Sequence, residues 1–216
     1  MERHSVAPHT ILVHGLARSR HDMFLLAPRL RRLLPEASVH TFDYRSRRLT
    51  LEQIVEQLAL FVGEKARGEP VSFVGHSLGG IVVRALDARG DSPAPLHRLV
   101  TLGSPHGGAS IAAFLNRARP FRALFGPVLA QLAELQLPEQ PKQISIGCVV
   151  GSGGSRLGFM PLFGEDNDGV VTVREATLGS AEGRAKRFML HALFPFSSEA
   201  ARLSALFLRK GNFLDS

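Results

Sequence analysis

Residues 71–80 read VSFVGHSLGG, and residues 81–86 read IVVRAL. The first four predict a short buried strand, and the apolar run that follows predicts a helix. Ser77 falls at the junction, where the chain must turn sharply, and Gly75 and Gly79 lack the Cβ atoms that would collide in such a turn. The pattern predicts a nucleophile elbow, which holds the serine oxygen at a helix amino terminus. A glycine-rich turn with an incidental serine is the alternative interpretation.

Apolar runs alternate with segments of helical period along the rest of the chain, which predicts parallel strands joined by crossover helices. Thr50 and Gln53 have the spacing of a capping box at the start of one such helix. Strands are also expected at 10–14, 39–44, 97–103, 143–150 and 170–173, and further helices at 22–34 and 198–209. The apolar residues of the helix after Thr50 recur at helical spacing and are expected to face the core: Leu51, Ile54, Val55, Leu58 and Val62.

Size and composition favour a single globular domain, 1–216, with a sizeable core. Hydrophobic residues make up 44% of the chain and charged residues 21%, which excludes a disordered chain. The formal net charge of +7 suggests nucleic-acid binding, but the basic residues are scattered and lack interleaved aromatic residues. We therefore expect a solvated, arginine-rich surface and no nucleic-acid partner. Attraction to anionic membrane surfaces or to acyl substrates is the alternative.

Cysteine usage and the first residues bear on the compartment. Cys148 is the only cysteine, so no intrachain disulfide can form, and its apolar surroundings predict a buried small side chain. Residues 1–9 contain no apolar segment of a signal peptide, and no membrane-spanning run is visible. A cytoplasmic location is the resulting expectation.

A serine nucleophile needs a base to take its proton and an acid to orient that base. In the elbow fold the acid and then the base follow the serine along the chain, each on a loop after a strand. Three histidines follow Ser77. His97 opens a strand and His106 comes too early in this order, so His191 is the expected base.

The expected acid is Asp168, in the sequence EDNDGVV at 165–171. The glycine after it permits a turn, and the β-branched run that follows would anchor the loop. A simple Asp-Gly turn is the alternative. Glu165 and Asp166 are expected to be solvated turn residues or ligands of a structural cation. Asp43 is a rival acid after the second strand, although it precedes the serine in the chain.

The oxyanion that develops during acyl transfer needs two backbone N–H donors. Leu78, the residue after the nucleophile, is one expected donor, and Leu16, in the loop after the first strand, is the other. Gly15 would let that loop approach the substrate closely. His14 could be taken for a base, but it is expected to hold the loop by side-chain hydrogen bonds.

Residues 110–137 are mostly apolar and are broken by Pro120 and Pro127, which predicts two or three short amphipathic helices. They could be ordinary helices packed on the sheet. They could equally form a small cap over the serine with an apolar acyl pocket. Both interpretations use the same residues, and they stay open at this point.

Taken together, these residues resemble the α/β-hydrolase family, and within it the bacterial lipase and esterase branch. The resemblance implies an α/β-hydrolase fold of minimal size, with a mostly parallel sheet of about six strands and helices on both faces. It implies a Ser77–Asp168–His191 triad, with supporting roles for His14, Gly15, Gly75, His76 and Gly79. The segments that carry the resemblance are 13–16, 75–80, 101–108 and 167–171.

The resemblance further implies cleavage of carboxylic esters through an acyl-enzyme, with no cofactor and no catalytic metal. The substrate would be a small acyl ester or a lipid. Transfer of the acyl group to another acceptor, or attack on a thioester, uses the same machinery and is a rival function. A hydrolase-fold binding module is a third interpretation, which a missing triad member would favour.

Overall fold

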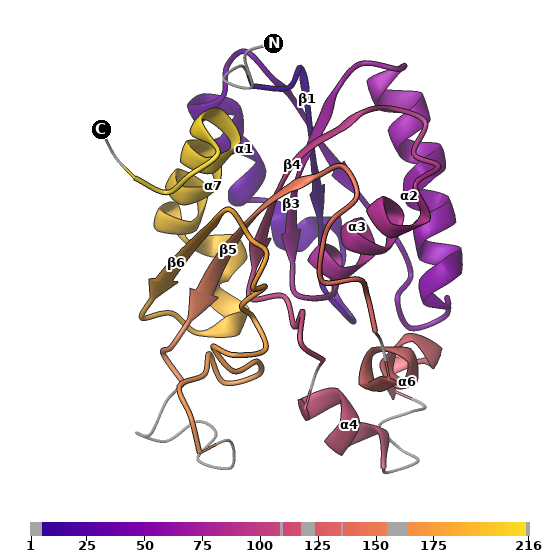
Figure 1. Cartoon of the computed structure of the whole chain (residues 1–216), viewed down its shortest axis with the longest axis vertical. Helices are drawn as coiled ribbons and strands as arrows, with labels where there is room; N and C mark the ends of the chain where they lie inside the picture. Colours follow the sequence, from indigo (N-terminus) through magenta and orange to yellow (C-terminus); the bar gives the residue numbers. More distant parts are fainter. Residues whose placement is uncertain (1–5, 109, 118–123, 135, 155–163, 215–216) are drawn as a thin grey trace.

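The computed structural model describes residues 6–108, 110–117, 124–134, 136–154 and 164–214. Its centre is one sheet in which all neighbouring strands run parallel, as expected (Figure 1). The strand order is β2-β1-β3-β4-β5-β6. The strands are β1 (His9–Val13), β2 (Ser38–Phe42), β3 (Val71–His76), β4 (Leu96–Leu102), β5 (Ser145–Gly151) and β6 (Gly183–Arg187).

Helices cover both faces of the sheet (Figure 1). α1 (Leu26–Leu33) and α7 (Ser198–Lys210) pack on one face, and α2 (Leu51–Ala66) and α3 (Leu78–Arg89) pack on the other. The short helices α4 (Ser110–Asn116) and α6 (Pro127–Glu134) lie beyond the carboxyl ends of the strands. Two 3₁₀ turns, η1 (Arg20–Met23) and η3 (His191–Phe196), complete the described elements.

The beginning of α2 confirms the predicted capping box. The Thr50 hydroxyl accepts a hydrogen bond from Gln53 N at 3.3 Å, and Gln53 Oε1 accepts one from Thr50 N at 3.0 Å. The apolar residues expected to face the core are all buried: Leu51, Ile54, Val55, Leu58 and Val62. Cys148 is fully buried in β5, also as expected.

The helix expected at 22–34 is divided in two. Ser19 and Asp22 cap the short turn η1, and α1 begins only at Leu26. Pro28 explains the division, because a proline has no N–H and is tolerated only in the first turn of a helix. With α1 starting at Leu26, Pro28 occupies that first turn.

The strand expected at 170–173 is wrong, and the sixth strand is β6 instead. The backbone of Val170 and Val171 is turned toward Asp168, whose Oδ1 accepts their N–H groups at 2.9 Å and 2.7 Å. These residues therefore form a turn with a single bridge, between Asn167 and Thr172. β6 reads GRAKR, so its charges hide the apolar alternation that would have identified a strand.

No helix in the described part of the chain has the length and apolar character needed to cross a membrane.

Candidate active site

Ser77 sits between β3 and α3 with a backbone conformation that side-chain-bearing residues rarely adopt. Its φ is 54° and its ψ is −122°. Such a conformation costs about 1–3 kcal/mol and persists only where the surroundings impose it. Here Ser77 N donates a hydrogen bond to Leu102 O at 3.0 Å, and Gly80 N donates one to Ser77 O at 3.2 Å. The chain therefore forms the strained turn that the sequence predicts.

The glycines around Ser77 are required by close backbone contacts. A Cβ at Gly75 would lie 2.4 Å from Gly80 N, and a Cβ at Gly79 would lie 2.1 Å from Val13 O. Gly80 is equally constrained, because its Cβ would lie 2.2 Å from the hydroxyl of Ser104. The elbow thus packs backbone directly on backbone, and no larger residue fits without movement.

Asp168 and His191 form a buried hydrogen-bonded pair. Asp168 Oδ2 accepts from His191 Nδ1 at 2.7 Å, and the two side chains are 1% and 10% exposed. The other carboxylate oxygen accepts from the amides of Val170 and Val171, and His191 N donates to the main-chain oxygen of Asp168 at 2.9 Å. Because Nδ1 carries the hydrogen, Nε2 of His191 is left as an acceptor. The pair therefore has the geometry of an acid orienting a base.

Gly103, directly after β4, makes room for this pair. Its φ is 61°, and a Cβ there would lie 2.9 Å from Asp168 Oδ2 and 3.2 Å from His191 Nδ1. The sequence analysis did not assign Gly103 a role. The signal that could have identified it is its position, as the glycine that ends a strand at the same sheet edge as Ser77.

His76, the residue before Ser77, connects the elbow to the base. Its Nε2 donates to the main-chain oxygen of His191 at 3.0 Å, and the two imidazole rings lie 4.9 Å apart. Burial is the main reason that the pKa of His76 lies well below its ordinary value, and the neighbouring His191 lowers it further. Nδ1 of His76 has no hydrogen-bond partner among the described residues. A neutral His76 thus supports the loop that carries His191.

His14 holds the loop after β1, as expected. Its Nδ1 donates to Gly15 O at 3.0 Å, and its Nε2 accepts from Tyr44 N at 3.2 Å. The hydroxyl of Tyr44 donates to His14 O at 2.6 Å, and the two rings stack 4.2 Å apart. Burial lowers the pKa of His14, which favours this neutral, hydrogen-bonded form. The rival acid Asp43 lies 3.3 Å from His14 Nε2 and is half-exposed.

A cavity of about 370 Å³, which we call the catalytic pocket, is lined by six of the predicted site residues: Gly15, Leu16, His76, Ser77, Leu78 and His191. Asp168 does not line this pocket and reaches it through His191. Leu78 is the first residue of α3, so its N–H has no partner within the helix. Leu16 lies on the loop that His14 holds. The geometry is compatible with both as oxyanion donors, which stays a prediction. The lining residues are Gly15, Leu16, Ala17, Arg18, His76, Ser77, Leu78, Pro105, Ala112, Phe125, Leu129, Leu132, Val170, Val171 and His191.

Four of these lining residues come from the segment 110–137, in α4 and around α6 (Figure 1). They are apolar: Ala112, Phe125, Leu129 and Leu132. Residues 118–123 and 135 of the segment, with the apolar Phe121 and Leu135 among them, lie outside the described residues. The described part therefore gives the pocket an apolar wall.

The remaining candidates have structural partners. His106 Nε2 donates to the hydroxyl of Thr101 at 3.1 Å, while its Nδ1 accepts from Arg84 at 3.2 Å. Glu165 pairs with Arg174 at 3.2 Å, and Asp166 pairs with Lys186. In the part of the chain that is described, no three His, Cys, Asp or Glu side chains gather closely enough to hold a metal ion.

The sequence of this chain matches one known protein family. Residues 9–137, more than half of the chain, match the family model described as palmitoyl protein thioesterase. No curated protein sequence matches the chain.

Solved structures share the whole architecture. The lipase BlEst2 of Bacillus licheniformis, in its mature form, superposes with a TM-score of 0.70 at 20% identity, over 94% of this chain and 91% of that one. The metagenomic carboxyl esterase MGS0156 gives 0.64 at 16% identity, over 94% of this chain and 75% of its own. A monoacylglycerol lipase of Paleococcus ferrophilus gives 0.61 at 14% identity, over 94% and 95%. These likenesses confirm the α/β-hydrolase fold.

Proposed function

The chain belongs to the palmitoyl protein thioesterase family, and on that premise we propose that it is a serine hydrolase that cleaves carboxylic esters of apolar acyl groups through an acyl-enzyme. The observation that carries the proposal is the strained Ser77 in one pocket with His191, whose ring is oriented by Asp168. The fold alone would not distinguish an enzyme from a binding module. A buried carboxylate–imidazole pair beside an elbow serine is the arrangement that acyl transfer requires.

In the proposed first step, Ser77 Oγ attacks the acyl carbonyl carbon while His191 Nε2 takes its proton. The Asp168 carboxylate stabilises the imidazolium that forms, because it accepts the Nδ1–H bond at 2.7 Å. The tetrahedral oxyanion accepts hydrogen bonds from the Leu16 and Leu78 amides.

The imidazolium then gives its proton to the leaving oxygen, and the bond between the carbonyl carbon and that oxygen breaks. Water repeats the sequence on the acyl-enzyme: His191 takes its proton, the hydroxide adds, and Ser77 leaves with a proton returned by His191. The carboxylic acid is released, and the Ser77 hydroxyl and the neutral His191 are restored, so the cycle needs no cofactor.

The acyl chain is proposed to lie against the wall formed by α4 and α6, so that the segment 110–137 acts as a small cap. Support comes from the apolar side chains that this segment contributes to the catalytic pocket, Phe125, Leu129 and Leu132 among them. An apolar wall with a few convergent polar groups is typical of small-molecule sites.

Thioester cleavage is the second candidate, because the matched family model is described as a thioesterase. The same residues perform it, and only the leaving atom changes from oxygen to sulfur. The two functions differ in the group that leaves, so substrates with one acyl chain and either leaving atom separate them.

The test is initial-rate hydrolysis of p-nitrophenyl esters from acetate to palmitate, beside matched S-acyl N-acetylcysteamine thioesters. Wild type is compared with Ser77→Ala and His191→Ala. We expect both variants to lose at least about 10³-fold in kcat/KM, and the chain-length optimum to give the length of the acyl site. A fluorophosphonate should modify wild type at Ser77 and should not modify Ser77→Ala.

Ser92→Ala and His97→Ala are the matched controls, because neither residue lines the catalytic pocket. They should retain wild-type rates. Inactivity of wild type on every ester and thioester, or equal rates in wild type and Ser77→Ala, would contradict the proposed function.

A further inference from the structure

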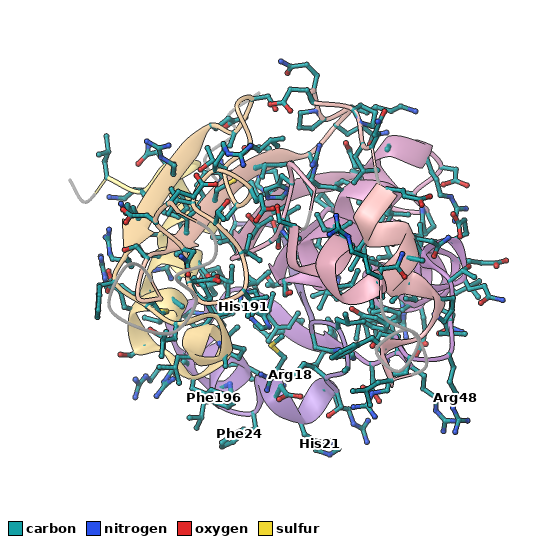
Figure 2. The ribbon with its side chains drawn as sticks, turned by 90° about the horizontal axis from the view of Figure 1, so that it is seen from below. Arg18, His21, Phe24, Arg48, His191 and Phe196 are labelled. Atoms are coloured by element: carbon teal, nitrogen blue, oxygen red, sulfur yellow. The ribbon has the colours of Figure 1, made fainter. Side chains whose placement is uncertain are left out.

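A second cavity, of about 700 Å³, adjoins the catalytic pocket at the carboxyl end of the sheet. We call it the basic cavity, and it is formed by the loops after β1 and β2, residues 17–22 and 43–48. Ala17 and Arg18 line both cavities. Figure 2 shows Arg18 near His191 and Arg48 farther out along the same edge of the molecule.

Four arginines and two aspartates line the basic cavity: Arg18, Arg45, Arg47, Arg48, Asp22 and Asp43. Both aspartates already accept hydrogen bonds. Asp22 accepts from Arg18 at 2.8 Å and from Ser19 N at 2.9 Å, and Asp43 accepts from Arg20 N at 2.8 Å.

The arginines at 45, 47 and 48 are exposed, and no carboxylate of the described residues pairs with them. Their guanidinium groups are thus available to an external anion.

The walls of the basic cavity are fixed relative to Ser77. Ser46 Oγ accepts a hydrogen bond from Ala17 N at 2.8 Å, which connects the loop after β2 (43–48) to the loop that carries Leu16. Tyr44 reinforces the connection through its bonds to His14. Gly126, beside Phe125 of the catalytic pocket, packs so closely on Arg47 that a Cβ would lie 2.1 Å from Arg47 O. A ligand in the basic cavity would therefore be held at a defined distance from the nucleophile.

The two cavities differ in polarity, which suggests which part of a substrate each one holds. The apolar wall around α6 suits an acyl chain, so the leaving group would extend past Ala17 and Arg18. Guanidinium groups bind phosphate oxygens through paired N–H bonds, and several of them together favour a group with more than one negative charge.

We propose that the basic cavity binds a phosphate group carried by the leaving alcohol or thiol of the substrate. The inference rests on the proposed function and extends it to a substrate class: acyl esters or thioesters whose leaving group is phosphorylated. Two sources share this chemistry, a nucleotide-bearing thiol and a glycerophosphate head group.

Two pairs of substrates with the same acyl chain test the inference. Decanoyl coenzyme A is compared with the uncharged S-decanoyl N-acetylcysteamine, and 1-decanoyl lysophosphatidic acid is compared with 1-decanoylglycerol. In wild type we expect kcat/KM to be about 10- to 100-fold higher for the phosphorylated member of at least one pair. A higher kcat/KM in the coenzyme A pair identifies a nucleotide-bearing thiol as the source of the phosphate, and a higher kcat/KM in the lysophosphatidic acid pair identifies a glycerophosphate head group. The advantage should shrink as NaCl is raised from low to high concentration.

The variant Arg47→Gln/Arg48→Gln should raise KM for the phosphorylated substrate about tenfold, which lowers its kcat/KM by the same factor. The uncharged substrates should react as in wild type. Arg31→Gln/Arg32→Gln is the matched control, because it removes the same charge from α1, which lines neither cavity. Arg47→Lys/Arg48→Lys should be intermediate, since lysine keeps the charge without the paired donors.

Equal kcat/KM within both pairs in wild type would overturn the inference, as would a double variant that slows charged and uncharged substrates alike. Neither result bears on the proposed function, which is contradicted if wild type hydrolyses no ester or thioester, or if Ser77→Ala retains the wild-type rate.

Discussion

The elbow at residues 75–80 and the acid–base corner formed by 166–171 and 189–191 perform one proposed reaction, but they are held in different ways. The elbow is fixed by backbone packed on backbone, with glycines where a Cβ would come within 2.1–2.4 Å of a neighbour. The corner is fixed by hydrogen bonds around one carboxylate, Asp168. We expect substitutions in the corner to impair chemistry while the fold survives, and substitutions of the elbow glycines to impair the fold itself.

Asp168→Asn should give the largest effect, on activity. The asparagine oxygen can still accept from Val170 and Val171, so the loop should keep its shape. Its amide would face Nδ1 of His191 and favour the tautomer with the hydrogen on Nε2, which cannot accept the serine proton. We expect kcat to fall by about 10³–10⁴-fold, with a thermal midpoint close to that of wild type.

Steady-state kinetics and a thermal melt on the same sample measure both quantities. Wild-type turnover by Asp168→Asn would show that the corner does not orient the base. If Asp168→Asn unfolded instead, the fold would depend on the corner as it does on the elbow, and the two regions would not differ in this respect.

Gly79→Ala tests the elbow directly. The added Cβ would lie 2.1 Å from Val13 O, and neither backbone can move without disturbing β1 or α3. We expect a loss of at least about 3 kcal/mol in the free energy of unfolding, measured by urea denaturation.

Gly169→Ala is the matched change in the corner. Unlike Gly79, Gly169 has a positive φ, 96°, and the nearest atom to its Cβ would be 4.0 Å away. Only backbone strain remains, at roughly 1–2 kcal/mol. If Gly169→Ala proved as damaging as Gly79→Ala, close packing would not be what distinguishes the two regions.

Low pH should lower the free energy of unfolding through three histidines whose pKa lies below the ordinary value. Burial lowers the pKa of His14 and His76, and it lowers that of His106 to about 3. In the unfolded chain the pKa of a histidine is about 6.5, so below that pH the unfolded chain binds more protons than the folded chain does. The free energy of unfolding therefore keeps its full value above pH ~6.5 and decreases as the pH falls toward 3.

Urea unfolding at pH 7.5, 6.5 and 5 measures this dependence. For His106→Gln, whose amide can still donate to Thr101 and accept from Arg84, we expect the loss between pH 6.5 and 5 to be smaller by about 1–2 kcal/mol. His21→Gln, at an exposed position, is the control substitution. An unchanged slope in His106→Gln would mean that His106 takes up its proton without opening the fold.

Local patterns predicted the elbow well, since the strand, the glycines and the helix of residues 71–86 are contiguous. The order of strands and helices was enough to nominate Asp168 and His191, which the structure brings within 2.7 Å. Gly103 could not be identified in the same way, because its role depends on side chains that arrive from two distant loops.

Other features were hidden by composition. β6 carries too many charges to show a strand pattern, and 170–173 carries β-branched residues although its amides are committed to Asp168. The basic cavity was seen only as scattered arginines, because Arg18 and 45–48 come from separate loops that meet beside the sheet edge.

β6 has a consequence for how copies of this protein meet in concentrated solution. It is the last strand of the sheet among the described residues, and no described strand pairs with its outer side, which could template a strand from another molecule. Arg184 and Lys186 are exposed on this strand, and Lys186 also pairs with Asp166. A second copy adding there would set like charges against one another, which opposes edge-to-edge aggregation. The charges that conceal β6 in the sequence thus help to keep an open parallel sheet from growing beyond one chain.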